Sequence, residues 1–244
     1  MLPPSAGTDV RPALVEVRAA IKDYGGLRPL RLQQFDLHEG ESVSLVGFDQ
    51  AMAEVLVNLI TGAILPDSGT ITVFGQPTHA IANTESWVAT LDQFGLISER
   101  AVMLDQLTVA QNLAMPLSLQ IETMPDDVRA RVREIGAEVG LSMAELDARV
   151  DALDPLARQR LRLGRALALN PRVLLAEHPN APLSEPDTRT FANVFQAVVS
   201  GRAIASVVLT ANHEFAAAIS SRVLALQPAT GTLKASSLWR RWLS

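Results

Sequence analysis

The residues best suited to bind a ligand or take part in a reaction stand at the ends of apolar segments of the sequence. Gly47 ends the run ESVSLVG and is followed by a helical pattern, while Glu177 and His178 end the run RVLLAEH. A buried strand that ends in glycine and leads into a helix is the setting in which backbone N–H groups bind phosphate. The segment around Gly47 is therefore a candidate phosphate-binding loop.

A metal site at Glu177 and His178, completed by Glu214, is the other chemistry that these residue types suggest. Adjacent residues on a strand point to opposite faces, so two neighbouring side chains do not converge on one ion. We therefore expect no metal ligands at these positions.

The elements that must position these residues form an α/β pattern. Residues 13–46 predict antiparallel strands followed by a buried strand. AEVLVNLITG predicts a helix with Gly62 just past its end, and PDSGTITVFG predicts a turn and a strand. WVATLDQFG, residues 87–95, predicts a strand that ends in a loop.

The second half of the chain begins with a helical block over residues 108–168, in which Pro125 and Pro155 stand near helix starts. Strands are predicted at 172–178 and 203–212, with a helix between them. This alternation is typical of a parallel sheet. The segment RVLALQPATGTLKA predicts a final pair of strands.

The composition excludes several classes of protein. The 244 residues carry a net charge of -5 and no cysteine, so we expect no nucleic-acid partner, no disulfide and no thiolate metal site. We also expect no secretory signal, and no apolar stretch is long enough to span a membrane. A role at a membrane is therefore expected from its cytoplasmic face.

The order and spacing of the motifs resemble those of ATP-binding-cassette (ABC) ATPases. The loop at Gly47 with LPDSGTITVFG resembles the region around Walker A, and LDQLTVAQNLAMPL resembles the stretch after the Q-loop. QRLRLGRALALNPRVLLAEHPNAPL resembles the signature helix and Walker B, and VVLTANHEFAAAISSRVLAL resembles the switch-histidine segment. The match covers residues 13–235, and LTVAQNLAMPL is most similar to cassettes of lipid and lipoprotein exporters.

The resemblance implies a single ABC-type domain over residues 1–244, with a RecA-type, mostly parallel sheet, an antiparallel N-terminal sheet and an inserted helical subdomain. The implied core lobe is 13–100 and 170–235, the helical subdomain is 101–169, and the tail is 236–244. Such cassettes work as head-to-tail dimers in which each Walker A faces the signature of the other subunit. A membrane permease docks beside the Q-loop.

The Walker A loop of the family holds phosphate with glycines, a lysine, and a Ser or Thr hydroxyl on magnesium. Here only the first glycine, Gly47, is present, and the lysine position holds Ala53. The remaining positions of the loop hold Gln50, Met52, Glu54 and Val55. Loss of one cation about 4 Å from a phosphate removes roughly 4 kcal/mol at an effective dielectric constant of about 20. ATP and magnesium are therefore expected to bind weakly or not at all.

The other motifs are altered as well. Glu99 stands at the Q-loop glutamine, Glu177 at the Walker B aspartate, His178 at the catalytic glutamate and Ser184 at the D-loop aspartate. The signature positions are Leu153, Asp154, Pro155, Leu156 and Ala157. The glycines that let a helix N-terminus approach the γ-phosphate of a partner subunit are therefore missing, and proline removes one N–H donor.

Two positions keep the residue type of the family. Tyr24 matches the aromatic residue that stacks on adenine, and a half-buried aromatic at the turn before Gly25 is an equal alternative. His213 matches the switch histidine. A helix-capping or core histidine is the alternative, and it is favoured.

Glu54 has two interpretations. In the first turn of the helix after the loop, its carboxylate could replace the missing phosphate and accept hydrogen bonds from exposed N–H groups. The alternative is a glutamate that faces solvent.

The C-terminal tail combines two tryptophans with two arginines, in the order Leu238, Trp239, Arg240, Arg241, Trp242 and Leu243. This composition suits an interface or a membrane surface. A terminal helix folded back onto its own domain is the alternative, and it is favoured.

The function implied by the resemblance is a non-catalytic, pseudo-ATPase cassette of a membrane transporter. It would pair with a second cassette, as a homodimer or heterodimer, and dock a permease at the cytoplasmic face of the inner or plasma membrane. The alternatives are a divergent active ATPase that uses Glu177 and His178, and a cassette-fold adaptor with no role in transport.

Overall fold

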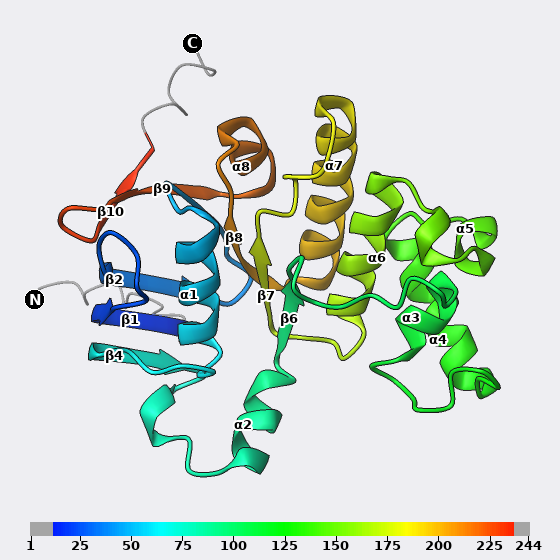
Figure 1. Cartoon of the computed structure of the whole chain (residues 1–244), viewed down its shortest axis with the longest axis horizontal. Helices are drawn as coiled ribbons and strands as arrows, with labels where there is room; N and C mark the ends of the chain where they lie inside the picture. The colour runs from blue at the N-terminus through cyan, green and yellow to red at the C-terminus, as the bar shows by residue number, and fades with distance from the viewer. Residues whose placement is uncertain (1–11, 237–244) are drawn as a thin grey trace, which may run out of the picture.

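The computed structural model describes residues 12–236, which form two sheets and their covering helices (Figure 1). The antiparallel sheet lies at one end of the molecule, the larger sheet lies in the middle, and a group of helices lies at the other end (Figure 1). The predicted interface or membrane contact of tail residues 238–243 falls outside the described residues.

The smaller sheet is antiparallel and has the strand order β2-β1-β4-β5. Its strands are β1 (Ala13–Lys22), β2 (Leu30–His38), β4 (Ser68–Val73) and β5 (Gln76–Pro77). Val15 and Val17 of β1 are fully buried, and they share one face because side chains alternate along a strand. The predicted antiparallel N-terminal sheet is confirmed.

The larger sheet has the strand order β10-β9-β3-β8-β7-β6. Its strands are β3 (Ser42–Val46), β6 (Phe94–Ile97), β7 (Val173–Glu177), β8 (Ala205–Leu209), β9 (Arg222–Gln227) and β10 (Thr232–Ala235). Its pairings are parallel except that of β9 with β10. Every residue of β7 and β8 is buried, because central parallel strands are covered on both faces.

Most helices lie on the larger sheet or beyond its β6 edge, whereas the short 3-10 helix after β5 contacts β4 of the smaller sheet. They are α1 (Gln50–Ile60), η1 (Thr78–Ala80), α2 (Thr84–Leu91), α3 (Val109–Ala114), α4 (Asp126–Glu138), α5 (Met143–Asp147), η2 (Val150–Ala152), α6 (Pro155–Leu167), α7 (Glu185–Arg202) and α8 (His213–Ile219). The predicted helical block at 108–168 is confirmed, with Pro125 at the N-cap of α4 and Pro155 as the first residue of α6.

Two hydrophobic clusters lie on opposite faces of β7. Val173 and Leu175 belong to the cluster shared with α1 and the antiparallel sheet, whereas Leu174 and Ala176 belong to the cluster shared with helices α3 to α8. The helical block therefore shares its core with α7 and α8. The bounds of the core lobe and of the helical subdomain stay a prediction.

The strand predicted over residues 87–95 is wrong over most of its length. Helix α2 ends at Leu91, and strand β6 begins only at Phe94. The Asn83 side chain accepts a hydrogen bond from the Ser86 N–H at 2.9 Å, and Trp87 Nε1 donates to the Thr61 carbonyl at 3.0 Å. A helix cap and a tertiary contact outweigh the strand propensity of this segment.

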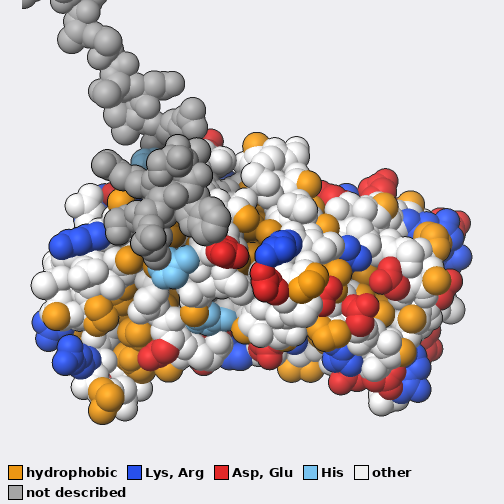
Figure 2. Space-filling view, turned by 90° about the horizontal axis from the view of Figure 1, so that it is seen from above, with side chains coloured by type: hydrophobic (Ala, Val, Ile, Leu, Met, Phe, Trp, Pro, Cys, Tyr) orange, Lys and Arg blue, Asp and Glu red, His pale blue; other side chains and the backbone are white. Residues whose placement is uncertain are grey.

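The surface carries charges of both signs. In Figure 2, acidic and basic side chains are intermixed, most densely at the end formed by α3 to α6. This face has no continuous basic patch of the kind that binds nucleic acid. Within residues 12–236, no helix is both long enough and apolar enough to cross a membrane.

Candidate functional site

The candidate residues converge at one edge of the larger sheet. Gly47 follows β3, Glu177 ends β7, and residues 98–100 follow β6. Because β3, β8, β7 and β6 run parallel, their carboxyl ends lie at the same edge. Open α/β sheets bind their ligands outside this edge.

In the loop after β3, a side chain of the loop itself caps the helix that follows. Gly47 has a φ of 86°, in the left-handed region that favours glycine. The Asp49 carboxylate accepts a hydrogen bond from the Met52 N–H at 2.8 Å and caps α1. Ala53, at the lysine position, is wholly buried. A carboxylate therefore already satisfies part of the helix terminus, and its negative charge opposes an incoming anion.

The hypothesis that Glu54 replaces the phosphate is wrong. Glu54 lies past the first turn of α1, where N–H groups already have partners inside the helix. Its Oε1 forms an ion pair with Arg100 Nη1 at 3.2 Å, and its side chain is 42% exposed. Asp49, not Glu54, caps the start of α1. The Glu54 carboxylate lies beside Arg100, in the segment after β6.

Glu177 is a buried carboxylate with a complete set of partners. It is only 2% exposed, and its Oε2 accepts a hydrogen bond from Ser98 Oγ at 2.7 Å. Arg100 donates to both oxygens, from Nη2 to Oε1 at 2.5 Å and from Nε to Oε2 at 3.4 Å. Buried charges need such pairing, since an unpaired carboxylate in the interior is strongly destabilising.

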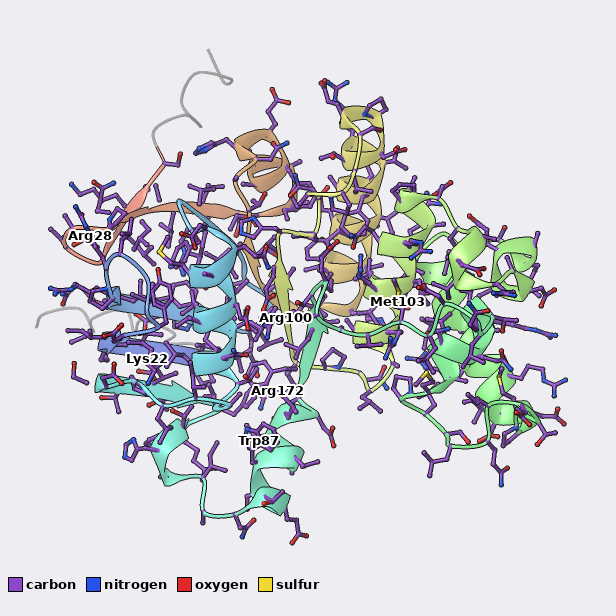
Figure 3. The ribbon with its side chains drawn as sticks, in the orientation of Figure 1. Lys22, Arg28, Trp87, Arg100, Met103 and Arg172 are labelled. Atoms are coloured by element: carbon purple, nitrogen blue, oxygen red, sulfur yellow. The ribbon has the colours of Figure 1, made fainter. Side chains whose placement is uncertain are left out.

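Arg100 joins the two acidic residues. Figure 3 shows it between α1 and the strands β6 and β7. Its guanidinium forms ion pairs with both Glu54 and Glu177. Partial burial lowers the pKa of Arg100, but the hydrogen bonds that Arg100 donates to Glu177 and the charges of Glu177 and Glu54 outweigh it and raise the pKa above its usual value. Sequence reasoning missed this residue, because no motif marks an arginine beside Glu99.

Glu99, at the Q-loop position, lies on the other side of the same segment. Its Oε1 pairs with Arg162 Nη1 of α6 at 3.3 Å. Arg165 Nη1, also on α6, donates to the Val102 carbonyl at 2.6 Å. Burial lowers the pKa of both arginines. The segment after β6 is therefore held to α6 as well as to the sheet edge.

The histidines and Ser184 take different roles. His178 has a φ of 43°, and its Nε2 is buried with no hydrogen-bond partner among residues 12–236. His213 is the exposed first residue of α8, so it is neither a helix cap nor a core histidine, and that alternative is wrong. The cap is Asn212, whose side chain accepts from the Phe215 N–H at 2.9 Å. Ser184 caps α7.

The signature positions form the start of α6. The Asp154 carboxylate accepts a hydrogen bond from the Ala157 N–H at 2.7 Å, and Pro155 is the first helical residue. Leu153 and Leu156 are partly buried against the helical core, and Ala157 is buried. This helix terminus, like that of α1, is occupied by a carboxylate of its own chain.

Tyr24 borders a hollow of about 470 Å³ beside the loop. The other residues that line it include Leu27, Arg28, Arg31, Asp49, Met52 and Leu226. Tyr24 is half-buried, and burial and then the charge of Asp49 raise the pKa of its hydroxyl. Its ring lies against Gly26, where a Cβ atom would come within 2.7 Å of it. Both interpretations of Tyr24 are compatible with this position.

Comparisons with known proteins place the chain in a family. The family model described as ABC transporter matches residues 30–181. The ABC transporter ATP-binding protein YtrE of Bacillus subtilis is 30% identical over 179 residues, which cover 73% of this chain and 76% of YtrE. The methionine import ATP-binding protein MetN of Leifsonia xyli is 31% identical over 219 residues, which cover 88% of this chain and 63% of MetN.

A solved structure agrees with the fold. The dimeric structure of the ATP-binding cassette MJ0796 bound to ADP and Pi has a TM-score of 0.75 at 20% identity, covering 92% of this chain and 98% of that chain. At this identity the likeness shows the fold alone. The family match and YtrE go further: the chain belongs to the ABC transporter family and has the α/β fold of its ATP-binding cassettes.

Proposed function

We propose that this chain is a non-catalytic cassette subunit of a membrane ABC transporter. The observation that carries the proposal is Ala53, which is wholly buried and uncharged at the position of the phosphate-binding lysine. Glu54 and Asp49 add negative charge on either side of it. The loop therefore presents carboxylates where the family presents a cation and a hydroxyl.

The magnitudes favour loss of nucleotide binding. One missing cation about 4 Å from a phosphate removes roughly 4 kcal/mol at an effective dielectric constant of about 20. The dipole of α1 returns only about 0.3 to 1 kcal/mol. Since about 1.4 kcal/mol is a tenfold change in affinity, binding in the manner of the family falls by orders of magnitude. The residues present do not fit magnesium-ATP.

The same argument applies to the signature. Asp154 places a carboxylate at the helix terminus that, in a cassette dimer, would face the γ-phosphate of the partner. In a mixed dimer, one composite site would lack a working Walker A loop and the other would lack a working signature. The eroded motifs at Glu99, Glu177 and His178 belong to the same proposal.

The proposed partners are a second cassette and a transmembrane permease, with the chain peripheral to the cytoplasmic face of the membrane. The dimeric structure of MJ0796 and the import role in the name of MetN support an assembly of this kind. The exporter type rests on LTVAQNLAMPL alone. The proposed lobes are 13–100 with 170–235, and 101–169.

A divergent active ATPase is the second candidate. The left-handed backbone of His178 and its buried, unpartnered Nε2 favour it, since strained residues often lie at functional sites. ATP turnover that His178→Ala abolished would establish this candidate. It would overturn the non-catalytic proposal.

Calorimetry with magnesium-ATP, ADP and a magnesium-free control tests the proposal. We expect no binding at millimolar nucleotide, because the loop has no cation to offset the phosphate charge. Binding at micromolar nucleotide would contradict the proposal and would require a phosphate site built from other residues.

A further inference from the structure

The guanidinium of Arg100 stands between Glu54 and Glu177. In the sequence, these two residues take the positions of the Walker A hydroxyl and the Walker B aspartate, the magnesium side of the site in the family. Arg100 contacts both, and Ser98 from the same segment contacts Glu177. A positive charge supplied by the chain therefore lies where a divalent ion would otherwise be needed.

The burial of Glu177 separates this contact from an ordinary surface ion pair. Exposed pairs contribute little, and Arg100 and Glu54 are 41% and 42% exposed. The Glu177 side chain is 1% exposed, so its charge requires a partner in the folded protein. The two hydrogen bonds from Arg100 supply that partner in the forked geometry that guanidinium and carboxylate share.

We infer that Arg100 is the resident cation of this cassette, a tethered guanidinium that replaces the divalent metal between Glu54 and Glu177. The inference concerns the same site as the proposed function and deepens it. The folded chain accordingly takes no free metal ion there. Within residues 12–236, no group of three His, Cys, Asp or Glu side chains is placed to hold an ion.

The position of Arg100 in the chain gives this replacement a mechanical consequence. The segment after β6 leads into the helices α3 to α6. Arg100 holds it to α1 and β7, while the Glu99–Arg162 pair and the Arg165–Val102 hydrogen bond hold it to α6. Ion pairs and a hydrogen bond within the chain therefore tie the segment after β6 both to the sheet edge and to α6.

The test is the thermal stability of the full chain without nucleotide, measured in EDTA and in Mn²⁺. We expect the melting temperature of the unmodified chain to be the same in both. Arg100→Ala should lower it by roughly 6 to 12 °C in EDTA, because Glu177 is left buried and unpaired. Mn²⁺ should restore part of this loss, and the restoration should vanish in the double variant Arg100→Ala/Glu177→Gln.

Arg158→Ala is the matched control, since it removes an arginine from the Arg158–Asp105 pair at 3.3 Å, away from Glu177. It should change the melting temperature little and should not respond to Mn²⁺. If Arg100→Ala does not fold, Arg100→Lys keeps the positive charge but loses the forked pair of hydrogen bonds. It should show a smaller loss of melting temperature and a weaker Mn²⁺ response than Arg100→Ala.

Two results would overturn the inference. One is Mn²⁺ binding by the unmodified chain, seen by electron paramagnetic resonance and lost in Glu177→Gln. The other is an Arg100→Ala protein as stable as the unmodified chain and indifferent to Mn²⁺. Neither result involves nucleotide, so failure of this inference is distinguishable from failure of the proposed function, which the ATP calorimetry tests.

Discussion

The starts of α1 and α6 carry the predicted Walker A and signature positions, and each is capped by an aspartate of its own segment. Asp49 accepts from Met52 at 2.8 Å, and Asp154 accepts from Ala157 at 2.7 Å. The difference lies in what surrounds them. The start of α1 is followed by Glu54, which Arg100 ties to Glu177, whereas the cap of α6 is a local contact.

The comparison sets a local helix cap beside an ion pair that joins distant segments. A local cap satisfies a few N–H groups and contributes about 1 kcal/mol. A tethered cation neutralises a buried carboxylate and connects distant segments, so its removal is expected to cost more. The predictions below separate these contributions.

The largest effect is expected at Arg100. Arg100→Ala should lower the free energy of unfolding by about 3 kcal/mol, because the buried Glu177 carboxyl group loses its cationic partner. The added change Glu177→Gln should recover about 1 kcal/mol or more, since no buried charge is then unpaired. Urea unfolding of the single and double variants measures both. If the single and double variants were equally stable, Arg100 would not be needed as the partner of the buried Glu177.

A lysine introduced at position 53 alone should not produce nucleotide binding. Ala53→Lys should destabilise the fold by about 2 kcal/mol, because the position is fully buried, and should leave ATP binding undetectable beside Glu54 and Asp49. The matched control is Ala51→Lys on the exposed face of the same helix, which should be close to neutral. Calorimetry and urea unfolding check the two expectations, and a gain of micromolar ATP binding in Ala53→Lys would contradict the first.

The two caps should be nearly equal in strength. Asp49→Ala and Asp154→Ala should each cost about 1 kcal/mol of stability, while Asn at either position should cost only a few tenths, since its side-chain oxygen still caps. Thermal unfolding of the four variants makes the measurement. A much larger loss at Asp154 would mean that the signature terminus is more than a local contact.

The smallest effect is expected at Asp67, whose exposed carboxylate pairs with Lys22 and caps neither helix. The hydrogen bond from Lys22 and that from the Asp23 N–H lower the pKa of Asp67 below 3.8. This carboxylate therefore stabilises the fold above pH 3.8, and its contribution is lost as the pH falls through its lower folded pKa. The stability difference between the unmodified chain and Asp67→Asn should shrink below that pH in urea unfolding. A difference that grew on acidification would reverse the assigned sign.

Much of the fold was predictable because its signals are local. The apolar runs at β3, β7 and β8 and the prolines at the starts of α4 and α6 mark their elements directly. Helix α2 was missed, because its Asn83 cap and the Trp87–Thr61 contact outweigh a strand-like composition. Arg100 was missed for a similar reason, since both of its partners are distant in sequence.

The sequence by itself determined the membership of the family and most of the strands and helices, with α2 as an exception, because these depend on residue type and spacing. Only the tertiary structure decided which charges meet. Glu54, Arg100 and Glu177 come from three separate segments, and parallel strands bring those segments to one edge of the sheet. An ion pair depends on distance and burial, and neither quantity is written in the spacing of residues along the chain.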